Sequence, residues 1–228
     1  MRIETPITKE RFKHHLAYSS WQYTLMVVLC IFGWSLLYTT TAYRSPEDKR
    51  IDIYVMSNTA TQDTMTPLME KIWHEVTPEM EVVNPVALLT GDDYMTYTQL
   101  TTYIGAGEGD IYLLNDQYFK SFAAQGAFLP LDDLVADGTI RVGDADLTTG
   151  YVTEVLDYDD NDIPLYGEKR LFGIPLDSFY GYMNSMRLDN RGLYAAIMIH
   201  NQNEENVIPF FNALLQEGVG EKEDWIIQ

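Results

Sequence analysis

The chain has 228 residues, of which 34 are acidic and 15 basic, so its formal net charge is −19. Residues 1–43 hold four basic and two acidic residues, which leaves 11 basic and 32 acidic residues and a net charge near −21 for the remainder. This charge repels phosphate backbones and anionic lipid head groups, which argues against nucleic-acid binding. This negative charge is compatible with neutral solutes, cations and basic proteins as partners. It is explained equally well if acidity only keeps an exported domain soluble.

The N-terminal part predicts one transmembrane helix over residues 21–43. No Asp, Glu, Lys or Arg lies between His14 and Tyr43, and about 20 apolar residues suffice to cross a bilayer as a helix. A buried core helix, the alternative, rarely stays free of charge over such a length. The only cysteine, Cys30, lies inside this run, where it acts as an apolar filler and excludes an intramolecular disulfide.

The flanking charges predict the orientation of this helix. Four basic residues precede the apolar run, and short basic flanks stay on the cytoplasmic side, although a second basic cluster at residues 44–50 weakens the rule. Cleavage after Ala42 is the competing interpretation, but the apolar run exceeds a usual signal-peptide core. We therefore expect a single-pass protein of the cell membrane, with a cytoplasmic segment over residues 1–20 and one extracytoplasmic domain over residues 44–228.

The extracytoplasmic part alternates predicted strands and helices. We expect strands over residues 51–56, 82–89 and 111–114, followed by helices through residues 65–76, 93–104 and 116–125. Pro78 ends the first helix, and Gly105 and Gly107 close the second as C-cap residues can. This order predicts an α/β fold with a mostly parallel sheet, helices on its faces and right-handed crossovers.

The pattern loosens after residue 134. The acidic region over residues 144–162 predicts one short helix and an exposed loop. Strands are expected over residues 171–176 and 194–199, and the spacing from Val207 to Leu215 predicts a closing amphipathic helix.

Two phrases carry a family resemblance. In the first, a glycine-rich helix end at residues 105–110 leads into a hydrophobic strand, a helix and the run Gly-Ala-Phe-Leu-Pro-Leu-Asp-Asp-Leu at residues 126–134. In the second, Gly-Ile-Pro at residues 173–175 is followed by Tyr182 and Asn184. Both resemble the extracellular solute-binding proteins of ABC importers, especially the sugar-binding group. The resemblance implies a periplasmic-binding-protein-like lobe, a carbohydrate ligand, and an ABC permease or another membrane protein as partner.

The chain departs from the two-lobed members of that family. In those proteins the chain crosses into a second lobe after the second phrase, whereas here ten residues, 185–194, separate Asn184 from a returning strand. One lobe leaves a ligand half-site open to water. We therefore hold two functions: a membrane-tethered module associated with carbohydrate import or sensing, and a non-transporting scaffold or accessory protein whose acidic surface docks a basic partner.

Ligand contacts are expected where the strands end, because open α/β sheets bind ligands outside the carboxyl ends of their strands. The candidates are Ser57, Asn58, Asp92, Tyr94, Asn115, Asp116, Asp177 and Tyr180. Carboxylates and amides bind sugar hydroxyls, and aromatic faces pack against the apolar side of a sugar. Ordinary structural roles compete with this interpretation, because Asn58, Asp92 and Asp116 are common N-cap residues and the tyrosines also suit packing.

One acidic stretch matches part of a metal motif. Positions 1, 3, 5 and 12 of an EF-hand calcium loop are occupied by Asp157, Asp159, Asn161 and Glu168. Asp162 replaces the usual glycine, Pro164 follows, and a strand comes next, which favours an acidic surface loop. No other cofactor is indicated, because glycines 105, 107 and 109 follow a helix, whereas a nucleotide loop follows a strand.

The sequence contains no recognisable catalytic motif. His74 and His200 are the histidines expected outside the membrane, and neither lies in a Gly-x-Ser-x-Gly or His-Glu-x-x-His motif. Paired carboxylates such as Asp132 and Asp133 also suit turns and helix caps. We expect a binding protein and not an enzyme.

Overall fold

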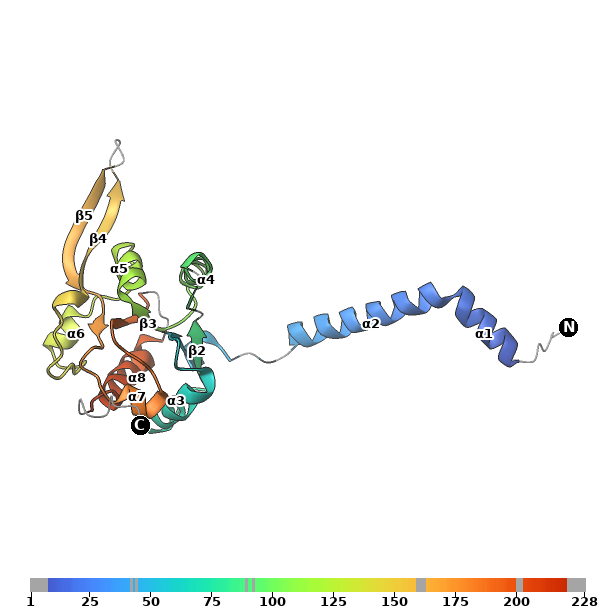
Figure 1. The fold of residues 1–228 in the computed structure, drawn as a ribbon, viewed down its shortest axis with the longest axis horizontal. Helices are drawn as coiled ribbons and strands as arrows, with labels where there is room; N and C mark the ends of the chain where they lie inside the picture. The colour runs from blue at the N-terminus through green and yellow to red at the C-terminus, as the bar shows by residue number, and fades with distance from the viewer. Residues whose placement is uncertain are drawn as a thin grey trace. The chain divides into compact units, whose positions relative to one another are not determined.

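The structure is a computed structural model that describes residues 8–41, 43, 45–88, 90–91, 93–158, 163–199 and 203–220. Its contacts divide the chain into two compact units, Met1–Arg44 and Ser45–Gln228. We treat each unit by itself (Figure 1).

The first unit contains two helices, α1 (Lys9–Tyr18) and α2 (Ser20–Thr41). No residue of α2 is buried, although the helix is apolar along its length. At 1.5 Å per residue its 22 residues extend about 33 Å, close to the thickness of a bilayer's hydrocarbon core. Hydroxyl groups of Thr24 and Thr39 donate to backbone carbonyls four residues earlier, at 3.0 and 2.8 Å, so these polar groups are satisfied within the helix. The helix is therefore long and apolar enough to cross a membrane.

The second unit is built on a five-stranded sheet in the order β2-β1-β3-β7-β6. These strands are β1 (Arg50–Met56), β2 (Val82–Leu88), β3 (Ile111–Asn115), β6 (Ile174–Pro175) and β7 (Leu193–Ile197). β1 pairs in parallel with β2 and β3, whereas β7 runs antiparallel to both β3 and β6. Four strands thus share one direction, and the expected mostly parallel sheet is confirmed.

Helices follow the first three strands as the alternation predicted. They are α3 (Gln62–Val76), α4 (Asp93–Gly105) and α5 (Asp116–Ala124). At the start of α3 the Thr61 backbone N–H donates to the Thr64 hydroxyl at 2.9 Å. The helix ends at Val76, two residues before Pro78. α4 closes through Gly107, whose φ of +71° places it in the left-handed region that a glycine tolerates.

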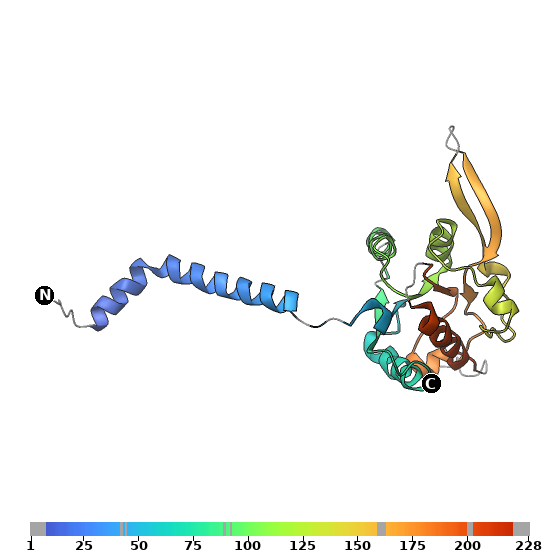
Figure 2. The ribbon, with the colours of Figure 1, turned by 180° about the vertical axis from the view of Figure 1, so that it is seen from behind.

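Alternating side chains of β1, an inner strand of the sheet, divide the core into two layers. Ile51, Ile53 and Val55 of β1 pack in the cluster that includes α3 and α8 (Glu204–Glu217). Tyr54 and Met56 pack in the other cluster, with side chains of α4 and α5. Figures 1 and 2 show α3 and α8 on one side of the sheet and α4 and α5 on the other. The period of two in a strand thus produces a sheet with helices on both faces.

The chain returns to the sheet directly after β6. One short helix, α7 (Tyr182–Met186), connects the region after β6 to β7, and α8 then packs beside α3. Residues 185–194, which separate Asn184 from the returning strand, therefore run from the end of α7 to the start of β7. Residues 45–220, where the structure describes them, form one compact unit.

The acidic region differs from the expectation of one short helix and a loop. It forms a hairpin of β4 (Tyr151–Tyr158) and β5 (Pro164–Leu171), which follows the short helix α6 (Asp132–Ala136) and a single 3-10 turn, Thr148–Gly150. The expected strand over residues 171–176 is also divided, because Leu171 ends β5 and only Ile174–Pro175 form β6. Two register irregularities interrupt the β4–β5 pairing, so the sequence lacks a clean period of two there.

Candidate ligand site at the carboxyl edge of the sheet

The ends of β1 and β3 bring two of the predicted polar loops together. Val55 of β1 lies beside Leu113 of β3, and Asn115 of β3 lies opposite Leu193 of β7. The loop that begins after Met56, the start of α5 after Asn115, and the loop that precedes β7 therefore meet at one edge of the sheet. This is the edge at which open α/β sheets place ligands.

Asn115 and Asp116 have local partners at this edge. The Asn115 side-chain oxygen accepts a hydrogen bond from the Tyr118 backbone N–H at 3.0 Å, so Asn115 is the N-cap of α5. Asp116 accepts from the Tyr194 hydroxyl at 2.9 Å and from the Lys120 ammonium at 2.6 Å. The Lys120 hydrogen bond, with a smaller contribution from Tyr194, lowers the pKa of Asp116. This carboxylate therefore stays ionised at neutral pH. The Asp116 side chain is 53% exposed to solvent.

The loop after β1 is held by its own hydroxyl groups. Ser57 Oγ accepts from the backbone N–H groups of Thr59 and Ala60, at 3.0 and 2.8 Å. The exposed Asn58 side-chain oxygen accepts from the Thr90 hydroxyl, which links this loop to the one after β2. Ser57 is therefore a turn residue, and Asn58 is the group of this loop that faces solvent.

The loop after β6 is fixed by a buried asparagine. Asn190 is fully buried, and its amide donates to the carbonyls of Leu176 and Phe179. Asp177, which is exposed, accepts from the Gly192 backbone N–H at 2.9 Å, and Tyr180 is partly buried. The strand ends before and after this loop are thus tied together.

Two of the predicted residues lie on or near α4. The Tyr94 side chain is 77% exposed in the first turn of that helix. Asp92 lies outside the described residues. Chemically, the edge offers hydrogen-bond acceptors: the Asn58 amide oxygen and the carboxylates of Asp116 and Asp177. Asn58 and Asp177 each accept one internal bond named above and Asp116 accepts two, and each group keeps further lone pairs.

The hairpin geometry does not fit the EF-hand calcium loop. Asp157 lies on β4 opposite Leu165, and Glu168 lies three residues further along β5, about 10 Å at the usual strand rise. Calcium ligands must approach one ion to about 2.4 Å, and Asp159 and Asn161 lie outside the described residues. Among the side chains that the structure describes, no three acidic, His or Cys groups converge on a metal position.

A buried acidic pair lies at the opposite edge of the sheet. Asp52 is 5% exposed, is ion-paired with Arg50, and accepts from the Asn84 amide at 3.0 Å. The Asp110 carboxylate accepts from the Asp52 backbone N–H at 2.6 Å, and burial raises the pKa of Asp110 to about 7. Sequence reasoning missed this pair, although a charged residue between Ile51 and Ile53 in a buried strand was a signal for it.

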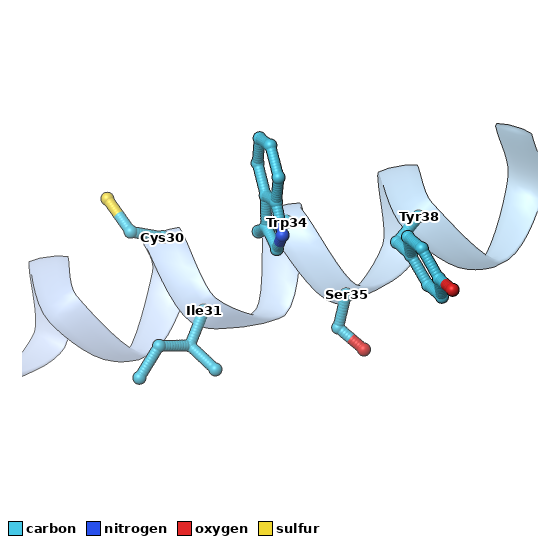
Figure 3. Close-up of a pocket in the computed structure, with 5 residues that line it drawn as sticks. All are labelled: Cys30, Ile31, Trp34, Ser35 and Tyr38. Carbon is cyan, nitrogen blue, oxygen red and sulfur yellow. The ribbon is translucent and has the colours of Figure 1, made fainter. Parts of the chain in front are cut away.

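One shallow hollow of the described residues lies on α2. It is lined by Cys30, Ile31, Trp34, Ser35 and Tyr38, which all belong to this helix. Figure 3 shows Cys30 and Trp34 projecting on one side of the helix and Ile31 and Ser35 on the other. A hollow on a single helix encloses no ligand, and on a membrane-crossing helix it suits lipid or a second helix.

No protein-family model matches the chain, and no curated protein matches it. Solved structures do show a likeness. A family 1 extracellular solute-binding protein from Alicyclobacillus acidocaldarius is 18% identical, over 55% of this chain and 27% of that one, with a TM-score of 0.36. An ABC substrate-binding protein from Listeria monocytogenes, in complex with cycloalternan, is 18% identical over 54% and 28%, with a TM-score of 0.36. The PBP AttC from Agrobacterium tumefaciens is 12% identical over 75% and 82%, with a TM-score of 0.39.

The chain resembles ABC solute-binding proteins. The chain matches about a quarter of the length of the first two structures, 27% and 28%. At these identities and TM-scores the likeness does not bear on what the chain binds. The ligand and the partners are therefore argued from the residues of this chain.

Proposed function

We propose that this protein is a membrane-tethered, extracytoplasmic binding module with a carbohydrate as its ligand, acting in import or sensing together with an ABC permease or another membrane protein. The observation that supports it is the carboxyl edge of the sheet, where exposed acceptor oxygens come from two loops, at Asn58 and Asp177, and from the first residue of α5, Asp116. Sugar hydroxyls donate to such groups, and Tyr94 and Tyr180 supply aromatic faces. The two sequence phrases suggest the same ligand class.

Weak binding is expected, because one lobe leaves the ligand exposed to water. A sugar at about ten times its Kd should stabilise the full chain in detergent by about 1.4 kcal/mol, which raises Tm by about 3–6 °C. Asp116→Ala and Asp177→Ala should reduce this shift. Thermal unfolding with a panel of neutral sugars measures it.

Asp137→Ala is the matched control for the sugar experiment. Asp137 also accepts a backbone hydrogen bond, from Thr139 at 2.9 Å, but it lies at the end of α6, away from the loops that follow β1 and β3. Its variant should keep the full shift. The carbohydrate proposal fails when no sugar shifts Tm in the parent, or when all three variants respond alike.

The proposal also requires an uncleaved anchor with the domain outside the cell. In a Cys30→Ser background the chain has no other cysteine, so Ser45→Cys and Thr5→Cys each introduce a single label site. A membrane-impermeant maleimide should label Ser45→Cys in intact cells and should leave Thr5→Cys unlabelled until the cells are lysed. The reverse pattern contradicts the orientation, and a mass beginning after Ala42 contradicts the uncleaved anchor.

An accessory interaction module is the second candidate function. It is favoured by the internal bonds of the site residues, because Asn115 caps α5 and Asp116 is paired with Lys120. It is also favoured by the net charge near −21 after residue 43, which suits a basic partner. An unchanged Tm with every sugar, together with a membrane protein that copurifies with the chain, supports this function over the first.

A further inference from the structure

The β4–β5 hairpin is a two-stranded sheet of its own. Each of its strands pairs only with the other among the described residues. Figures 1 and 2 show it rising clear of the five-stranded sheet, with β4 on the side of α5 and β5 on the outer side. Isolated two-stranded sheets are marginally stable in water, so a ribbon of this length calls for an explanation.

The base of the hairpin is fixed to the domain. The Leu131 backbone N–H donates to the Leu171 carbonyl at 2.7 Å, and Phe172 N–H donates to the Gly150 carbonyl at 3.1 Å. Asp132 accepts from the Leu171 N–H at 3.1 Å and from the Arg170 guanidinium at 3.2 Å. The ribbon is therefore held in a defined position at one end only.

The distal half of the hairpin exposes large apolar side chains. Leu156 is 64% exposed, Leu165 50% and Tyr166 66%. Val155 pairs with Tyr166 on one face, and the Leu156 side chain lies against Gly167 on the other face, which Leu165 shares, so these apolar groups cluster in the distal half and cover both faces of the ribbon. Such a cluster on a projecting ribbon is typical of an interaction surface, because burying each of these side chains would contribute roughly 1–2 kcal/mol.

The negative charge of the hairpin favours a basic partner protein. Residues 151–171 contain six acidic residues and two basic residues, and one of the two, Arg170, is ion-paired with Asp132. A second copy of this chain would bring the same negative charge against it. A basic partner would meet both the acidic side chains and the apolar cluster.

We propose that the distal half of this hairpin is a docking ribbon for an extended basic segment of a partner protein, which adds as a third strand along the outer edge of β5. The edge of β5 that no described strand pairs with supplies the backbone hydrogen bonds, and Leu165 on one face and Tyr166 on the other supply the apolar contacts. The acidic side chains attract the segment and exclude self-pairing. This docking does not depend on whether a sugar binds at the carboxyl edge.

A synthetic peptide tests the proposal on the full chain in detergent. The probe is the fluorescent, acetylated and amidated peptide Thr-Lys-Val-Lys-Val-Lys-Val-Thr, which is basic on one face and apolar on the other. We expect saturable binding by fluorescence anisotropy, weakened several-fold when salt rises from about 50 to about 300 mM. Hydrogen exchange should slow at β5 amides when the peptide is bound. A peptide with glutamates for lysines should not bind.

Two hairpin variants and one matched control complete the test. Leu165→Thr and Tyr166→Thr keep a strand-forming residue, and each should weaken binding about fivefold to tenfold. Val219→Thr removes an apolar side chain that is 62% exposed elsewhere on the domain and should leave binding unchanged. Hydrogen exchange of β4 and β5 in the unbound variants checks that the hairpin persists.

Three results would overturn the proposal. The first is a parent chain that does not bind the basic peptide. The second is equal binding by a peptide in which proline replaces each valine, since that peptide has the same charge but cannot pair as a strand. The third is equal binding by the hairpin variants and the parent.

Discussion

Gly109→Ala should lower the free energy of unfolding by about 3–5 kcal/mol. Gly109 has a φ of +87°, which strains any residue with a Cβ. A Cβ at this position would lie 2.5 Å from two ring carbons of Tyr54 and 2.9 Å from the Tyr112 hydroxyl. These rings stack with centroids 5.1 Å apart inside the core, so they cannot move away freely. Chemical denaturation of the full chain in detergent measures the loss.

Gly138→Ala separates the two causes of that loss. Gly138 has a similar φ of +82°, but a Cβ there would meet nothing within 4 Å. Its variant should therefore lose only the conformational part, about 1–2 kcal/mol. Equal losses at the two positions would contradict a steric role for the stacked tyrosines.

Asp110→Asn should make the protein more stable at pH 8 by about 2–4 kcal/mol and leave its stability at pH 4 nearly unchanged. The pKa of Asp110 is raised by burial from 3.8 to about 7 in the folded state. Between these two values the folded state holds a proton that the unfolded state has lost, so stability falls as pH rises through this window. An asparagine keeps an acceptor for the Asp52 N–H and has no proton to lose.

Glu79→Gln is the control for this pH dependence, because it removes one charge from an exposed side chain. The quantity to compare is the difference in unfolding free energy between each variant and the parent, measured from pH 4 to pH 8. This difference should grow with pH for Asp110→Asn and stay flat for Glu79→Gln. A flat difference for both variants would show that Asp110 is not held protonated by the fold.

The regular part of the fold could be predicted from local patterns. The strand at residues 51–56 is a short, mostly apolar run, and it is buried on both faces. The helix that buries Met65, Leu68, Met69 and Ile72 carries a clear helical period, so burial and sequence indicate the same element in both cases. The alternation of strands and helices also indicated that β1, β2 and β3 run parallel to one another. The family resemblance of the phrases around Gly105 and Gly173 indicated the same architecture.

The hairpin could not be predicted from those patterns. Its strands carry acidic residues at Glu154, Asp157 and Glu168, which suggest a loop, and its irregular register removes the alternation that marks a strand. The Asp52 and Asp110 pair was missed for another reason. Its members are 58 residues apart and meet only when β1 and β3 pair, which no local pattern shows.

The residue types at the sheet edge decide only part of what the candidate residues do. Strand ends identified these positions, but the sequence pattern assigned the competing N-cap role to Asp116, whereas the structure gives it to Asn115, one residue earlier. The tie from Asn190 to the loop after β6 depends on a buried contact that sequence position does not reveal. Ligand contact by the exposed residues stays a prediction.

The position of β7 has a consequence for the order in which the protein folds. β7 lies between β3 and β6, and it is the last strand of the sheet to be synthesised. Until residues 193–197 emerge, β3 has an open edge and β6 has no partner in the sheet. We therefore expect β2, β1 and β3 with their helices to form first, and the nascent chain to need protection at that edge until its C-terminal part arrives.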